Sequence, residues 1–252
     1  MQPITARVPA FRPRKVTWNV PAATLDAASD PLASVECIKF GYRFNGSFDG
    51  IVWPRNVKQI KFDVDFNMPV DMVQWSASLQ QLKFGQDFDW PIDRVTWPSS
   101  LQRLELSWLF NHPIDRVTWP SCRVACSLQH LIFGQDFNQP IARVAWPASL
   151  QTLSFFGKFN QPMDGVSWPS LRKLEFGDSF NQPIDRAWWP SSLEHLKFGY
   201  HLNQPITGVT SPGSLRQLEF SFSFSFTQPV DEVEWPVSLQ KLTIAQRPGD
   251  AL

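Results

Sequence analysis

Four histidines are the side chains best suited to acid–base or metal chemistry: His112, His130, His195 and His201. A histidine changes charge near neutral pH and binds metals through its ring nitrogens. His130 and His195 occupy the same position in two copies of a repeated segment, three copies apart, which separates them by about 14 Å at strand spacing. They therefore cannot share a metal ion. His112 replaces the Gln of other copies, and we interpret it as a local substitution.

The cysteines offer a second kind of chemistry. Cys122 and Cys126 form a C-x-x-x-C pair inside a five-residue insertion. A zinc site needs further ligands, and its cysteine pairs are usually closer in sequence, so we interpret these two as free thiols of an irregular loop. With Cys37 they are too few and too irregular for a disulfide framework. We therefore expect an intracellular, cytoplasmic protein.

An aspartate follows an apolar residue in most copies of the repeat, at Asp71, Asp93, Asp115, Asp164, Asp185 and Asp231. A column of carboxylates binds calcium in some β-helix repeats, but those sites need glycine-rich turns. Here an arginine follows the aspartate at positions 94, 116 and 186, so we predict a turn-capping acceptor in place of a metal ligand. Phosphate-loop, zinc-protease and hydrolase motifs are absent from the sequence. We expect no catalytic residue, no metal and no cofactor.

The elements that position these residues are copies of one 22-residue unit, L-x-x-L-x-F-G-x-x-F-N-Q-P-I-D-x-V-x-W-P-x-S. Its first segment begins at Val35, Val57, Leu79, Leu101, Leu128, Leu150, Leu171, Leu193, Leu215 and Leu239. Because side chains alternate along a strand, the fourth and sixth residues of this segment should point inward together. Equivalent segments should then stack as one parallel sheet.

Two prolines per unit, in the Q-P and W-P steps, shape the path between strands. Proline lacks an N–H and restricts the residue before it to extended conformations. We therefore predict extended or turn-like return segments, with a short helix expected only in Thr24–Ser34.

Two template positions predict ladders through the stack. One is a buried aromatic column of Phe44, Phe66, Phe88, Phe110, Phe137, Phe159, Phe180 and Phe226, with Leu202 once in their place. The other is an amide column of Asn45, Asn67, Asn111, Asn138, Asn160, Asn181 and Asn203. Such amides can satisfy backbone groups that no strand reaches, so we interpret both columns as structural.

The run F-N-Q-P-I, followed by W-P-x-S-L-x-x-L-x-F, resembles the FNIP repeat family, a relative of the leucine-rich repeats. The best matches are residues 137–155 and 180–198, and the resemblance covers about residues 35–244. It implies a right-handed or curved solenoid with an interaction role, and it brings no catalytic residues. The sequence departs from the leucine-rich pattern by placing Trp where Leu normally precedes Pro.

The predicted fold is mainly β, a leucine-rich-repeat-like solenoid of about ten 22-residue turns with one parallel sheet and non-helical returns. Residues 1–34 form a degenerate partial repeat and an irregular segment, 35–244 the solenoid, and 245–252 a tail. The chain begins inside a repeat and ends soon after one. Because solenoid ends need capping, we expect edge-to-edge self-association or membership of a longer array.

Charge and hydropathy exclude two classes of partner. Lys plus Arg equals Asp plus Glu at 23 each, so the chain has no bulk attraction to nucleic acid or to anionic membranes. No window of the sequence is long and apolar enough to span a membrane, and the first residues lack the pattern of a secretory signal. We expect a protein partner.

Recognition by a solenoid depends on the positions that vary. We expect Lys39, Lys61 and Lys83 to stack in register beside Lys58, which suits either an anionic partner or, as we favour, lysines splayed into water. The other candidate binding residues are Arg103, His130, Lys173 and His195 on the sheet and Tyr42, Trp108 and Tyr200 in the loop after it; Trp90 and Trp188 are also off-template.

Two functions follow from these positions. The first is a non-catalytic scaffold that binds a protein through the exposed face of the sheet and the adjacent loops. The alternative is a carbohydrate or small-ligand binder that uses the off-template aromatics, because aromatic rings beside amides suit such ligands.

Overall fold

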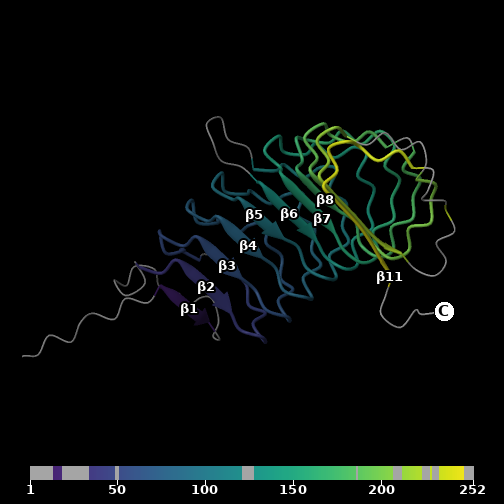
Figure 1. Ribbon diagram of the computed structural model, residues 1–252. Coiled ribbons are helices and arrows are strands. Elements are labelled where there is room, and N and C mark those ends of the chain that lie inside the picture. The colour runs from purple at the N-terminus through teal and green to yellow at the C-terminus, as the bar shows by residue number, and fades with distance from the viewer. Residues whose placement is uncertain are drawn as a thin grey trace, which may run out of the picture.

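The computed structural model describes residues 14–18, 34–48, 51–120, 128–185, 187–206, 212–222, 228 and 233–246. They form one sheet of eleven parallel strands in sequence order, each paired with the strands before and after it (Figure 1). The strands are β1 Lys15–Trp18, β2 Cys37–Phe40, β3 Gln59–Lys61, β4 Gln81–Lys83, β5 Arg103–Glu105, β6 His130–Phe133, β7 Thr152–Phe155, β8 Lys173–Glu175, β9 His195–Phe198, β10 Gln217–Phe222 and β11 Lys241–Gln246.

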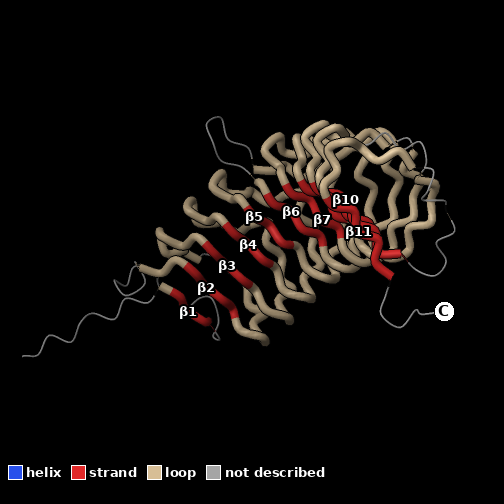
Figure 2. Tube along the Cα trace, in the orientation of Figure 1, coloured by secondary structure: helices blue, strands red, loops and turns tan. Residues whose placement is uncertain are grey.

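Every described segment between the strands is turn or coil, as Figure 2 shows in tan. Within this part of the chain, no helix is long and apolar enough to cross a membrane. The predicted parallel solenoid with non-helical returns is therefore confirmed. The stack bends, so the C-terminal turns are seen nearly end-on where the N-terminal turns are seen from the side (Figure 1).

The sheet has one strand more than the ten expected. Strand β1 precedes the first predicted copy and pairs in register with β2, Lys15 opposite Cys37 and Val16 opposite Ile38. Its segment, P-R-K-V-T-W, lacks the leucines of the template, so the repeat pattern does not predict a strand there. The expected helix lies outside the described residues, except for Ser34, which is in a turn.

Burial alternates along the strands as the template predicts. In β9, Leu196 and Phe198 are buried, while the alternating residues His195 and Lys197 are only half-buried. The first apolar residue of every copy from Val35 to Leu215 is also fully buried, whereas Leu239 of the last copy is half-buried. Burying one such side chain stabilises the fold by about 1.5–3 kcal/mol. The core is thus a continuous apolar column along the inner face of the sheet.

Two columns of phenylalanine fill that core side by side. Within one turn, Phe155 and Phe159 lie with ring centroids 4.0 Å apart. Between turns, Phe159 stacks on Phe180 at 6.2 Å with an interplanar angle of 4°. The predicted aromatic column is confirmed, including the buried Leu202 that replaces one ring; Phe226 lies outside the described residues.

The tryptophans of the W-P steps form a third column, in which Trp53 stacks on Trp75 at 5.8 Å. Their indole N–H groups are buried, and six of them have no hydrogen-bond acceptor: those of Trp53, Trp75, Trp97, Trp119, Trp146 and Trp189. Each such group costs about 1–3 kcal/mol of desolvation. Ring stacking and apolar burial must offset that cost, so these tryptophans are fixed by packing and not by polar contacts.

The predicted amide column bonds to the backbone of its neighbours. The Asn160 N–H donates to Asn138 Oδ1 at 2.9 Å, and Gln161 Nε2 donates to both the main-chain and side-chain oxygens of Asn138 at 2.9 Å. The same N–H to Oδ1 bond joins Asn67 to Asn45, Asp89 to Asn67, Asn111 to Asp89, Asn138 to Asn111, Asn181 to Asn160 and Asn203 to Asn181. The ladder satisfies backbone donors that lie beyond the sheet.

A second ladder runs through the serine after each W-P step. The hydroxyl of this serine donates to the carbonyl of the first strand leucine in the preceding turn, as Ser149 does to Leu128 at 2.9 Å. Ser100, Ser192, Ser214 and Ser238 make the equivalent bond. Each corner that carries one of these serines is thus tied to the turn before it.

Substituting Asn138 by Ala should lower the free energy of unfolding by about 1–3 kcal/mol, because the donors of Asn160 and Gln161 lose an acceptor. The matched control is Asn138→Asp, which keeps an Oδ1 acceptor as Asp89 does naturally and should cost less than about 1 kcal/mol. Chemical denaturation followed by tryptophan fluorescence measures both. Equal losses in the two variants would show that the ladder oxygen carries no stability.

Candidate functional site

The predicted lysine column forms on the exposed face of the sheet. Lys39 pairs in register with Lys61, and Lys61 with Lys83. Two of the three ammonium groups bond to carboxylates: Lys39 Nζ lies 2.9 Å from Asp63 Oδ2 and Lys83 Nζ 2.7 Å from Glu105 Oε2. Lys58 is similarly paired with Glu36 at 3.3 Å. Most of the positive charge of this column is therefore neutralised within the sheet.

The remaining sheet candidates fall into two pairs on neighbouring strands. Arg103 stands opposite His130, and Lys173 stands opposite His195. Both cations bond to a glutamate on their own strand, Arg103 Nε to Glu105 Oε1 at 2.7 Å and Lys173 Nζ to Glu175 Oε1 at 2.8 Å. Exposed pairs of this kind contribute about 0–1 kcal/mol each. They make this face a surface of compensated charge.

An aromatic cleft lies where the strands end. Trp108, 59% exposed, and Phe156, 47% exposed, line a cleft of about 500 Å³ together with Lys83 and Glu105. Tyr42 and Tyr200 occupy the same slot as Trp108 on distant turns, and Tyr200 is half-buried beside the His201 ring at 5.3 Å. The cleft therefore joins two of the predicted residues, Lys83 and Trp108, and leaves the tyrosines apart.

A glycine forms the gap between the two exposed rings. Gly134 belongs to the turn between those of Trp108 and Phe156, and a Cβ there would overlap the backbone carbonyl of Ser107. Only glycine permits that close approach of consecutive loops. In the next turn Phe156 takes the slot of this glycine, and Gly157 follows with a φ of 53°. The loop is thereby re-routed and the Phe156 ring remains outside the core.

Sequence reasoning missed two exposed apolar residues, Phe156 and Leu109, the latter 42% exposed. A signal for Phe156 was present, because the template reads F-G after the strand whereas this copy reads Phe155-Phe156-Gly157. A large apolar residue in a slot that glycine, serine or aspartate fills in the other copies has no room in the packed interior and faces solvent. Leu109 carried no comparable signal.

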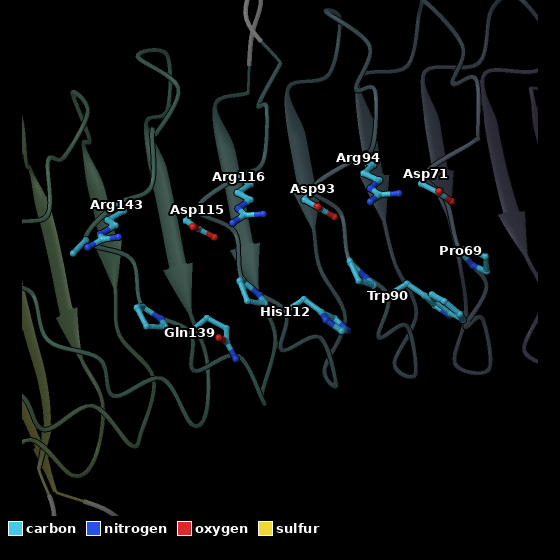
Figure 3. A pocket seen from close by; sticks show the side chains of 14 residues that line it. Pro69, Asp71, Trp90, Asp93, Arg94, His112, Asp115, Arg116, Gln139 and Arg143 are labelled. Carbon is cyan, nitrogen blue, oxygen red and sulfur yellow. The ribbon is translucent and has the colours of Figure 1, made fainter.

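A second concave surface lies on the return segments. It is a groove of about 920 Å³ that crosses four consecutive turns, and Figure 3 shows its side chains in two rows. One row holds Asp71, Asp93, Arg94, Asp115, Arg116 and Arg143, and the other holds Pro69, Trp90, His112 and Gln139. Sequence analysis had noted Trp90, His112 and the aspartates separately, without bringing them to one place.

The aspartates of this groove do not cap their turns. The side chains of Asp71, Asp93 and Asp115 are exposed and accept no hydrogen bond from any described residue, so the predicted capping role is wrong for them. The turn closes through the backbone instead, as where Val95 N–H donates to the Ile92 carbonyl at 3.3 Å. A backbone-closed turn leaves the carboxylate free to face solvent.

The interpretation of His112 as a substituted glutamine is confirmed. His112 Nε2 lies 3.0 Å from the Asp89 carbonyl oxygen, as Gln139 Nε2 lies 2.9 Å from that of Asn111. Trp90 makes the same contact, its indole N–H donating to the Asn67 carbonyl at 3.0 Å. All three side chains are held at the rim of the groove by a bond to the preceding turn.

Within the described part of the chain, no group of three His, Cys, Asp or Glu side chains is placed to hold a metal ion. His130 and His195 lie on β6 and β9, three strands apart as expected. Cys122 and Cys126 lie outside the described residues.

The repeat pattern and this geometry agree with the comparisons. The model of the family described as FNIP Repeat matches residues 110–158 and 159–201. Residues 110–201 are FNIP repeats. The chain is also similar to the crystal structure of CroV588, described as a novel circular LRR protein structure, with 34% sequence identity and a TM-score of 0.73. The match covers 85% of this chain but 31% of that one. No curated protein matches the sequence.

Two glutamates of the exposed sheet face have perturbed acidity. Burial alone would raise the pKa of Glu105, but hydrogen bonds from Lys83 and Arg103 outweigh it and hold that pKa below its ordinary value of 4.5. Burial likewise opposes hydrogen bonds from Lys173 and Ser154 at Glu175, and its pKa is also lowered. Burial lowers the pKa of His130, and the charge of Arg103 adds to the effect. The neutral form of His130 therefore lies beside the Arg103–Glu105 pair.

Stability should fall as the pH drops below about 4.5, because a carboxylate with a lowered folded-state pKa stabilises the fold only while it is ionised. Urea denaturation at a series of pH values measures this loss. The Glu105→Gln variant should flatten the acid limb, and adding Glu175→Gln, three strands away, should flatten it further. Curves that stay parallel to the parent curve would contradict the assignment.

Proposed function

We propose that this FNIP solenoid is a non-catalytic scaffold that binds a protein partner through the Trp108–Phe156 cleft and the sheet face beside it. The observation that carries the proposal is the cleft itself. It places two large exposed rings on one recess of about 500 Å³, whereas the described phenylalanines and tryptophans at template positions are buried or partly buried in the core. A protein that exposes such rings together gains nothing in stability from them, and grouped apolar surface marks interaction sites.

The surroundings of the cleft support a protein partner. Aromatic anchors at the centre of an interface, with polar groups around them, are the usual arrangement of binding energy. Here the Lys83–Glu105 ion pair borders the cleft on the sheet side. An apolar side chain of the partner would enter between Trp108 and Phe156, while polar groups would meet compensated charges that discriminate against misaligned contacts.

Main-chain hydrogen bonds between consecutive turns hold the loops that border the cleft. The Trp108 carbonyl accepts the N–H of Asp136 at 2.7 Å, and the Leu109 N–H donates to Gln86 at 3.2 Å. Each loop that borders the cleft is therefore bonded to the loop before it. Preorganised anchors lose less conformational entropy on binding, which favours affinity.

The basic column is the weaker candidate. Lys39 and Lys83 already bond to carboxylates, so an anionic partner would have to displace those contacts. Lys61 is the member of the column that makes no ion pair with a described residue. We infer that charge on this face tunes the orientation of the partner and that the apolar cleft supplies most of the affinity.

Trp108→Ala should reduce partner capture by about tenfold or more, as expected for loss of a buried aromatic anchor. The full chain and its variants serve as bait, and quantitative mass spectrometry compares the proteins retained. The matched control is Trp188→Ala, because Trp188 is 73% exposed but lies outside the cleft. Equal retention by both variants would exclude the cleft, and loss confined to the Lys39→Glu, Lys61→Glu, Lys83→Glu triple variant would assign binding to the basic column.

A further inference from the structure

The turns that form the groove on the return segments differ from the repeat template at a slot beside the groove. Further along the chain the slot before the proline of the Q-P step is uniform, with Gln139, Gln161, Gln182 and Gln204. In the three preceding turns the same slot holds Met68, Trp90 and His112. Structural ladders need sameness from turn to turn, whereas recognition needs differences. The departures from glutamine at this slot, Gly46, Met68, Trp90 and His112, lie in four consecutive turns, three of which contribute residues to the groove.

The charged row of the groove is balanced and unpaired. It contains three arginines and three aspartates, and none of the six makes an ion pair with a described residue. On the sheet face, by contrast, most charges are paired. A polyanion such as a nucleic acid would meet the aspartates, and a polycation would meet the arginines. The groove therefore favours a neutral ligand that can both donate and accept hydrogen bonds.

The backbone of the groove offers a peptide little to pair with. Pro69, Pro91, Pro113 and Pro140 line it and have no N–H. The N–H that closes each turn is already bonded, as Val117 is to Ile114 at 3.3 Å. A peptide that binds by strand addition needs free main-chain donors and acceptors along an edge. Recognition here must come from side chains.

We propose that this groove binds a neutral oligosaccharide laid across the turns. The groove volume of about 920 Å³ lies at the upper end of ordinary ligand sites. Sugar hydroxyls donate to carboxylates and accept from guanidinium groups, and the pairs Asp93–Arg94 and Asp115–Arg116 supply both functions on two consecutive turns of the groove. Charge-assisted bonds of this kind are stronger than neutral ones. Successive sugar rings would meet successive copies of the same pair.

Trp90 supplies the apolar contact that a sugar ring needs. The face of a pyranose carries C–H groups that pack against an aromatic ring, and the tryptophan ring is the largest available. Trp90 is 41% exposed, and the bond from its indole N–H to the Asn67 carbonyl fixes it at the groove rim. His112 and Gln139 continue that rim on the next two turns (Figure 3). The ligand would lie between this rim and the Asp–Arg row.

The test is calorimetric titration of the full chain with three hexasaccharides: cellohexaose, maltohexaose and mannohexaose. We expect at least one to bind, with Trp90→Gln weakening it by about tenfold and Arg116→Ala by about threefold to tenfold. The Trp90→Gln variant restores the template residue, whose amide donates to the preceding turn as Gln139 does. It therefore removes the ring without removing the structural bond.

Two control variants test whether a loss of saccharide affinity is specific to the groove. Trp188→Ala removes an exposed tryptophan outside the groove, and Trp108→Ala removes the ring of the cleft assigned to a protein partner. Neither should change the affinity for the saccharide. Failure of all three sugars to bind overturns the proposal, as does saccharide binding that survives Trp90→Gln. Groove-dependent binding of a displayed peptide in place of sugar would also overturn it, and none of these results bears on Trp108.

Discussion

The solenoid depends on a common register, in which the hydrogen-bonding groups of each turn lie level with those of the next turn. A single turn cannot bury its own apolar side or satisfy its own coil, because the described parts of the return segments contain no helix and little local hydrogen bonding. The asparagine and serine ladders supply the missing bonds between turns, and the phenylalanine and tryptophan columns supply the apolar contact. All of these interactions require a common register, and the stability of each turn therefore resides largely in its neighbours.

This requirement divides the repeat into fixed and free positions. Phe, Asn and the W-P serine are fixed by contacts to both neighbouring turns, whereas the sheet face and the groove rim can vary as long as the backbone path is kept. Trp90 illustrates the boundary, since its ring departs from the template while its N–H preserves the bond that glutamine makes elsewhere. Phe156 is the other kind of departure, because it changes the path and needs Gly157 at a positive φ to do so.

The fold could be predicted from sequence because its main positions are repeated in many copies. The features that the prediction missed are those that the repeated pattern does not specify. The register of the strands, the inward residues and both predicted columns follow from positions copied many times. Strand β1 was not anticipated because its segment lacks the leucines that define the pattern. Asp71, Asp93 and Asp115 were assigned a capping role from their residue type, but backbone bonds close their turns. The groove depends on how four return segments lie together, and side-chain identities along one copy do not specify that arrangement.

The ladder also shows where the coil can change length. Asn138 N–H donates to Asn111 Oδ1 at 2.9 Å although 27 residues separate them, and Asn181 donates to Asn160 at 2.8 Å across 21. The additional residues follow Trp119, and the missing one precedes Leu171, so both changes fall at the corner between a W-P step and the next strand. At that corner the number of residues in a turn can change while the bonds between successive turns are kept. An insertion there can lengthen the chain while the register of the turns on either side is kept.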